Sequence, residues 1–257
     1  MTKKLYQIFL SHSLQETLIY RSTSIFIVTF GIMFFAIELI AGTVYFEYTD
    51  SILGWTKYDY YMLICTSNMI QSGYQLFFSS AHESLSEKIM EGELDYIFIR
   101  PVNSFLYYAL YRMDIPSIIN FTLATIMQIV MMRKGSYSVM QIICFAVFIL
   151  LGIWFLFLIN QIVVMTAFWK EKSNKLLGVP EYLVDAATRP KDMYPNIIKY
   201  LLIWIIPVFT TINGPIDILK NNYEIKAFLW YFLYLIIFSF LTYRMWLKGL
   251  EKYKSAN

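Results

Sequence analysis

Long apolar stretches alternate with short polar segments along most of the chain. Six stretches approach the length of about 20 residues that a helix needs to cross a membrane. They cover approximately residues 22–46, 59–81, 113–132, 138–169, 198–214 and 226–246. The pattern therefore predicts an all-α polytopic membrane protein with six transmembrane helices in one domain, 1–257.

The segment before the first stretch, residues 1–21, also looks helical but is only weakly amphipathic. It carries Lys3, Lys4 and Arg21. We expect this segment to lie at the cytoplasmic interface of the membrane and to lead into the first span.

Composition supports a membrane location. Residues of the set AVILMFWYC make up 58% of the chain and charged residues only 15%, whereas soluble domains carry about 25% charged residues. A soluble protein of this size could not bury so much apolar surface. The net charge of +3 gives no indication of a nucleic-acid partner.

The distribution of Lys and Arg predicts the orientation. If the N-terminus is inside, 16 of these cations fall in inside segments and 5 in outside segments. The longest inside loops are then 82–114 and 170–199. By the positive-inside rule, we expect a multi-pass protein of the cell membrane with both termini cytoplasmic.

The chain lacks the usual catalytic motifs. None of its ten glycines is followed by lysine, so it has no phosphate-binding P-loop. It has no G-x-S-x-G or H-E-x-x-H motif, and its two histidines are far apart in the sequence. We therefore predict no catalytic residue and no metal ligand.

An acidic segment follows the second span. Glu83, Glu87 and Glu91 recur every four residues and share one helical face. Gly92 stands where a helix would end, and Arg100-Pro101 marks a second turn. Two interpretations remain open: a cytoplasmic helix that docks onto a soluble partner, or a solvated helix face.

A polar stripe runs along the second span. Its members fall on one helical face, and they are Asn68, Gln71, Ser72, Gln75 and Ser79. Asn120 and Gln128 on the third span and Asn160 on the fourth add polar groups that we expect to face the bundle. The stripe is either a substrate path or dimer seam, or a set of hydrogen bonds between helices.

The first span carries one ionisable group, Glu38. An acid within a span indicates a functional site by default. The alternative is that Glu38 lies close to the outer interface, where ionisation costs little.

Several motifs resemble those of a known family. The stretch 91–102 (EGELDYIFIRPV) is similar to the G-x-L-D-x-x-L-x-[RK]-P-[VI] signature that follows the second span of ABC-2 type permeases. Phe98 and Ile99 stand where leucines are commoner. The stretches 189–195 (RPKDMYP), 205–208 (IIPV) and 249–257 (GLEKYKSAN) resemble a subfamily of paired, uncharacterised permeases of about this length.

The resemblance implies a type V exporter-like permease subunit that moves a peptide, lipid or toxin with energy from a separate ATPase. It implies a second permease subunit, related or identical, and a lipid environment, with ATP and Mg on the ATPase and no cofactor in this chain. The interfacial helix would be a connecting helix, and 207–219 an extracellular re-entrant element. The cytoplasmic coupling helix would lie within 82–101, with ATPase-coupling residues Glu83, Glu87, Glu91, Gly92, Glu93, Leu94, Asp95, Arg100 and Pro101.

Two other classes compete with this interpretation. A self-contained secondary transporter or channel would need ion sites in broken helices near the midplane, usually within inverted repeats, and neither is evident. A membrane-embedded enzyme would need a catalytic cluster.

Overall fold

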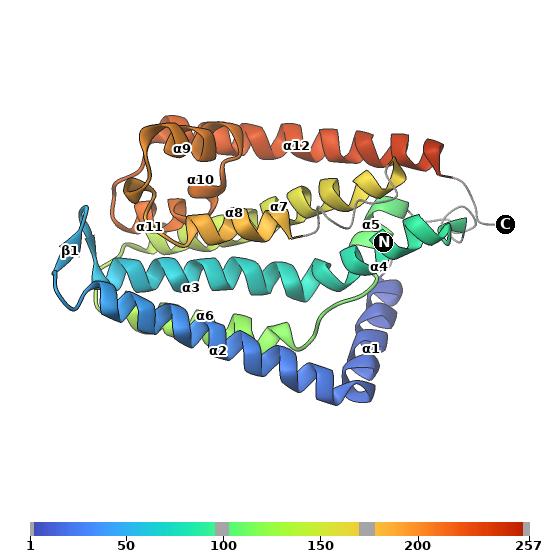
Figure 1. The fold of residues 1–257 in the computed structure, drawn as a ribbon, viewed down its shortest axis with the longest axis horizontal. Helices are drawn as coiled ribbons and strands as arrows, with labels where there is room; N and C mark the ends of the chain where they lie inside the picture. The colour runs from blue at the N-terminus through green and yellow to red at the C-terminus, as the bar shows by residue number, and fades with distance from the viewer. Residues whose placement is uncertain (1–2, 96–102, 170–177, 254–257) are drawn as a thin grey trace.

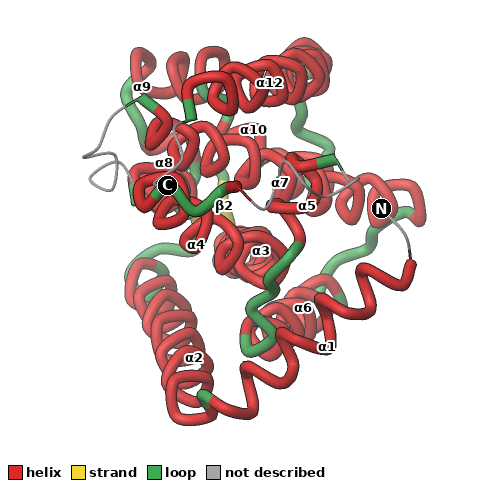
Figure 2. The backbone as a smooth tube through the Cα atoms, turned by 90° about the vertical axis from the view of Figure 1, so that its right-hand side faces the viewer, coloured by secondary structure: helices red, strands yellow, loops and turns green. Residues whose placement is uncertain are grey.

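Long helices run side by side along the length of the molecule in the computed structural model, which describes residues 3–95, 103–169 and 178–253 (Figure 1). They are α2 (Arg21–Tyr45), α3 (Lys57–Tyr74), α6 (Ser117–Met132), α7 (Val139–Met165) and α12 (Ile225–Lys252). Helix α3 lies at the centre and contacts α2, α6 and α7 (Figure 2).

Several helices of this bundle are long and apolar enough to cross a membrane. Among the described residues, three helical segments are long and apolar enough to span a membrane: 21–45, 139–168 and 225–252. The segments 117–132 and 196–205 are apolar but shorter. The expectation of an all-α polytopic membrane protein is therefore confirmed, while the number of six spans stays a prediction.

Glycines allow the central helices to approach closely. A Cβ atom on Gly73 of α3 would lie 2.4 Å from Cδ1 of Ile153, and a Cβ on Gly152 of α7 would lie 2.6 Å from Cδ1 of Ile70. Each glycine thus receives an isoleucine from the facing helix. Small residues at such positions are typical of helix packing in membranes.

One end of the bundle carries a two-stranded hairpin, which the sequence did not predict. Strands β1 (Ser51–Ile52) and β2 (Trp55–Thr56) pair antiparallel. Leu53 and Gly54 form the turn with φ of 49° and 80°, as a two-residue hairpin with primed turn geometry requires. We call this the hairpin end.

The opposite end, the α4 end, carries the shorter helices that precede or interrupt the bundle. Helix α1 (Lys3–Ile19) crosses this end at an angle to α2 (Figure 1). Helix α3 continues without a break through the π-helical segment η1 (Gln75–Ser79) into α4 (Ser80–Glu91). Helix α5 (Ser104–Leu110) packs on α4.

The predicted span over 198–214 is not one continuous helix. The structure has short helical pieces here, which are α9 (Asn196–Tyr200), η6 (Leu201–Ile205), α10 (Val208–Ile212) and α11 (Gly214–Leu219). The chain turns at Ile206, whose backbone is extended (φ −125°, ψ 90°), because Pro207 cannot continue the hydrogen-bond ladder. All residues of α10 and α11 are buried, so this region is an element folded back into the bundle.

The inside loop predicted over 170–199 is also wrong in its second half. After η3 (Thr166–Phe168) and the undescribed residues 170–177, helix α8 (Val179–Ala187) returns along α7 toward the hairpin end (Figure 1). The following segment η5 (Lys191–Met193) contacts the hairpin, since Trp55 Nε1 donates to Asp192 Oδ2 over 3.3 Å. The Lys and Arg count misplaced Arg189, Lys191 and Lys199, which reduces the charge bias between the two ends.

Ion pairs lock the hairpin end together. Lys191 Nζ lies 2.5 Å from Asp217 Oδ2 in α11, and both side chains are largely buried. Lys199 pairs with Asp192. Burial alone would raise the pKa of Asp192, but hydrogen bonds from Lys199 and Trp55 hold it below its ordinary value.

Candidate functional site

Helix α4 presents the acidic face that the sequence predicted. The side chains of Glu83, Glu87 and Glu91 are all exposed, whereas Leu85 and Ile89 are buried against the bundle. The opposite burial of the two faces follows from the helical period. The acidic face therefore remains available to a soluble partner.

The predicted end of this helix at Gly92 is confirmed. Gly92 has a left-handed backbone with φ of 73°, and its N–H donates to the carbonyl of Lys88. The N–H of Glu93 donates to the same carbonyl over 2.9 Å, which gives the pattern of a Schellman motif. A side chain with a Cβ atom would be strained at this position.

The turn after Gly92 is anchored to the bundle. Leu94 is completely buried, and its N–H donates to the hydroxyl of Tyr253 over 2.6 Å. Glu93 stays exposed and Asp95 is half-buried. The predicted coupling residues Arg100 and Pro101 lie outside the described residues. Leu94 thus holds the turn in place, while Glu93 stays exposed.

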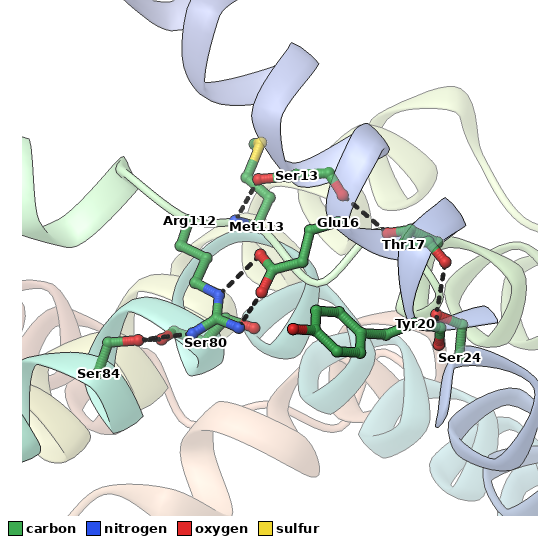
Figure 3. Close-up of polar contacts among 9 residues, drawn as sticks. All are labelled: Ser13, Glu16, Thr17, Tyr20, Ser24, Ser80, Ser84, Arg112 and Met113. Atoms are coloured by element: carbon green, nitrogen blue, oxygen red, sulfur yellow. Dashed lines mark hydrogen bonds and ion pairs between the residues drawn. The ribbon is translucent and has the colours of Figure 1, made fainter. Parts of the chain in front are cut away.

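A polar junction joins α1 to α4 through Arg112 (Figure 3). The guanidinium donates to both carboxylate oxygens of Glu16 in α1, with Nε to Oε2 at 3.0 Å. Its Nη1 donates to Ser84 Oγ in α4 over 2.9 Å. The hydroxyl of Ser13 accepts from the N–H of Met113 over 2.9 Å. These hydrogen bonds link α1, α4 and the segment before α6 to one another.

Removing this junction should loosen α1 selectively. We expect Arg112→Ala to weaken the attachment of α1 to the bundle by about 1 kcal/mol of free energy, because the ion pair is bidentate but partly exposed. The measurement is hydrogen exchange of the α1 amides in the purified protein, which should accelerate. The exposed Arg133→Ala at the hairpin end is the matched control. Unchanged exchange in Arg112→Ala would contradict the junction.

A second polar contact ties α4 to α7. The imidazole of His82 is buried, with Nδ1 2.9 Å from the Tyr74 hydroxyl and Nε2 2.8 Å from Gln161 Oε1. Both ring nitrogens therefore have partners, as buried polar groups require. His82 fixes the orientation of the start of α4.

A groove of about 960 Å³ opens beside α3. Its lining comes from α2, α3, η1, α4, α6, α7 and α8, from Asp114 before α6, and from the residues on either side of α8. Figure 2 shows α2 and α8 to the left of α3, α2 below it and α8 above it. The groove extends from His82 and Glu83 at the α4 end to Tyr60 and Arg189 toward the hairpin end.

The groove brings together most of the polar residues that the sequence analysis selected. Those that line it are Glu38, Gln71, Gln75, Ser79, Asn120 and Asn160. Asn68 does not line the groove, but its Nδ2 donates to Glu38 Oε2 over 2.7 Å. Four helices, which are α2, α3 with its continuation η1, α6 and α7, thus direct polar groups to one surface.

Two selected residues lie elsewhere. The hydroxyl of Ser72 donates to the carbonyl of Asn68 within α3. Gln128 is buried in α6, and neither of its side-chain polar atoms has a hydrogen-bond partner in the described part of the chain. Neither residue reaches the groove, which leaves them as internal groups of the bundle.

Sequence reasoning missed the contribution of α8. Glu181, Asp185 and Arg189 line the groove, and Pro180 and Val184 line it as well. Pro180, Val184 and Ala187 are buried. The four-residue spacing of the charged groups is that of one helical face, and Pro180 near the start of the helix is a start signal. That signal was available in the sequence, but the surrounding cations favoured a cytoplasmic loop.

Acids also gather at the α4 end of the groove. Burial raises the pKa of Glu83, and the neighbouring Asp114 carboxylate raises it further, while Arg112 opposes the shift. Among the described residues, no group of three or more His, Cys, Asp or Glu side chains could hold a metal ion.

Comparison with known proteins gives one match. A model of the family described as ABC-2 family transporter protein matches residues 11–257. No curated protein and no solved structure matches the chain.

Proposed function

The chain belongs to the ABC-2 transporter family, as its motifs predicted, and from this premise we propose that it is an export permease. Members of this family are membrane components of ABC transporters and work with an ATPase subunit; they are not themselves catalytic. The proposal adds the direction of transport, the cargo and the roles of particular residues. The cargo is an amphipathic or apolar molecule, since the groove combines apolar walls with a limited number of polar groups.

The exposed acidic face of α4 carries the proposal. It lies at the same end of the molecule as α1, and the Schellman turn and Leu94 hold its tip in a defined position. A rigid, charged helix end of this kind suits a groove on a soluble ATPase. In this assignment α4 is the coupling helix, α1 is the connecting helix, and the α4 end faces the cytoplasm together with both termini.

The groove between α2, α3 and α8 is the substrate path in this proposal. It opens beside α2, which is largely exposed along its length, and a second permease subunit, related or identical, would cover that side. The protein would then function in the cell membrane, surrounded by lipid, with ATP and Mg bound by the ATPase and no cofactor in this chain. The elements α10 and α11 would close the outer side.

Joint purification and transport test the proposal. The tagged full chain is expressed with a candidate ATPase subunit and a candidate second permease of the same family. We expect all three to purify together and to accumulate an amphipathic dye in inverted vesicles only with ATP. A complex whose ATPase lacks its P-loop lysine is the control. Dye transport by the chain alone, or by the inactive control, would instead indicate a self-contained secondary transporter or channel.

A further inference from the structure

The charged groups of the groove are predominantly acidic. Five carboxylates line it in the described part of the chain, against the single guanidinium of Arg189. They come from α2, α4, the segment before α6, and α8, and they are Glu38, Glu83, Asp114, Glu181 and Asp185. Because several elements contribute, the acidity belongs to the groove as a whole and not to one solvated helix face.

The carboxylates lie near one another at two levels. Toward the α4 end, Glu83 interacts electrostatically with both Asp114 and Glu181. Farther along, Asp185 of α8 interacts with Glu38 of α2. Like charges held together in a partly buried space repel one another, so each level is stabilised by a cation between its members.

The cations of the protein compensate this charge only in part. Arg112 offsets part of the charge of Glu83 and Asp114, but its guanidinium donates to both carboxylate oxygens of Glu16, outside the groove. Arg189 follows Asp185 by one helical turn and lies toward the hairpin end, where it also interacts with Tyr60. The α4 end and the middle of the groove are therefore the negative part, and field lines are focused there by the apolar surroundings.

The remaining lining is apolar and aromatic. Phe34, Tyr45, Tyr60 and Tyr74 contribute rings, and Ile64, Leu156 and Val164 contribute aliphatic surface. Aromatic faces attract organic cations. The volume of about 960 Å³ lies near the upper end of the range of about 300–1,000 Å³ typical of small-molecule sites.

We propose that this groove binds an amphipathic organic cation of drug-like size, with its charge between the carboxylates and its apolar body against the rings. The inference rests on the proposed function, because it names the substrate class of the same groove. A cationic ligand would add to the partial compensation that Arg189 gives Asp185 and would supply a counter-charge to Glu38, which accepts a hydrogen bond from the neutral Asn68. The apolar walls would exclude small hydrated ions.

Two probes of nearly identical shape and opposite charge test the proposal. Tetraphenylphosphonium and tetraphenylborate are titrated into the purified full chain in a zwitterionic detergent, and binding is measured by equilibrium dialysis against protein-free detergent. We expect the cation to bind at least about tenfold more tightly than the anion. The groove carboxylates attract the cation and repel the anion, and a difference of about 1.4 kcal/mol in binding free energy is tenfold in affinity.

Variants locate the binding. Asp185→Asn and Glu38→Gln should each weaken tetraphenylphosphonium binding about tenfold, a loss of one charge interaction. Glu47→Gln removes an exposed carboxylate outside the groove and should leave binding unchanged. As a check on folding, the thermal midpoint of each variant is recorded without probe, and Asp185→Glu should restore binding.

Three results would overturn the inference: equal binding of the two probes, unchanged binding in both groove variants, or an equal loss in Glu47→Gln. The proposed function is judged separately by joint purification with the ATPase. A chain that purifies with its ATPase but shows no charge preference refutes only the cationic substrate. A chain that binds the cation but has no ATPase partner refutes the transporter assignment.

Discussion

Reversing two charges on the exposed face of α4, with Glu87→Lys and Glu91→Lys together, should abolish association with the ATPase. Both side chains are exposed, so the change leaves the packing of Leu85 and Ile89 intact. Glu87 and Glu91, four residues apart, already repel each other, so exchanging both for lysines adds little cost to the helix. The expected loss is therefore one of docking and not of folding.

The magnitude follows from the number of charges. Each reversal replaces an attraction with a repulsion worth at least about 1.4 kcal/mol, so two reversals weaken the complex by at least about hundredfold. The measurement is the amount of ATPase recovered with the tagged permease, together with ATP hydrolysis in reconstituted vesicles. The neutral pair Glu87→Gln and Glu91→Gln should give an intermediate loss.

A control on the same end of the molecule makes the test specific. Glu251 is exposed near the end of α12, and Glu251→Lys changes the same charge without touching α4. We expect this variant to retain the ATPase. Full recovery of the ATPase by the α4 double variant, with normal insertion into the membrane, would refute the assignment of α4 as the coupling helix.

The continuity of the helix explains how docking could affect the groove. Lys57 to Glu91 form one helical path through α3, η1 and α4, and Gln75 and Ser79 of η1 line the groove. Single π-helical turns occur frequently at functional sites. If the ATPase displaced α4, Gln75 and Ser79 would move with it because they belong to the same helical path. Helix α1 would move as well, because Arg112 links it to α4.

Strong local signals explain what the sequence predicted well. The apolar stretches at 22–46, 138–169 and 226–246 appear nearly intact as α2, as α7 with η3, and as α12. Gly92 ends α4 because the turn needs a left-handed backbone. The spacing from Asn68 to Ser79 places polar groups on one helical face, and Gln71, Gln75 and Ser79 reach the groove.

The missed features depend on contacts between distant segments. Lys191 and Lys199 read as cytoplasmic cations, because the positive-inside rule counts charges without knowing their partners. In the structure they pair with Asp217 and Asp192 at the hairpin end. Helix α8 has only nine residues. Its start signal at Pro180 marks a helix but does not show that the helix enters the bundle, so the place of its acids in the groove could not be predicted.

Removing one partner of the Lys191–Asp217 pair should destabilise the hairpin end strongly. Asp217 is buried in α11, and Asp217→Asn leaves the Lys191 ammonium without its counter-ion in a largely buried position. Such a loss costs about 3 kcal/mol, the lower end of the range for buried pairs, since Lys191 retains some exposure. The same segment is held by two further hydrogen bonds: the Lys191 N–H donates to Asn213 Oδ1, and Asn213 Nδ2 donates to the carbonyl of Ala187 at the end of α8. A displacement of Lys191 would weaken both.

Thermal unfolding of the purified protein measures this loss. A cost of about 3 kcal/mol corresponds to a decrease in Tm of about 6–12 °C for a chain of this size.

The apolar double variant Lys191→Met with Asp217→Leu should recover most of the loss, because removal of both charges eliminates the unpaired ion. Lys226→Met removes an exposed cation at the same end and should leave Tm unchanged. A double variant no more stable than Asp217→Asn would show that the pair acts through something other than its charge. Equal Tm values for Asp217→Asn and the unaltered protein would show that the element formed by α10 and α11 is held by packing alone.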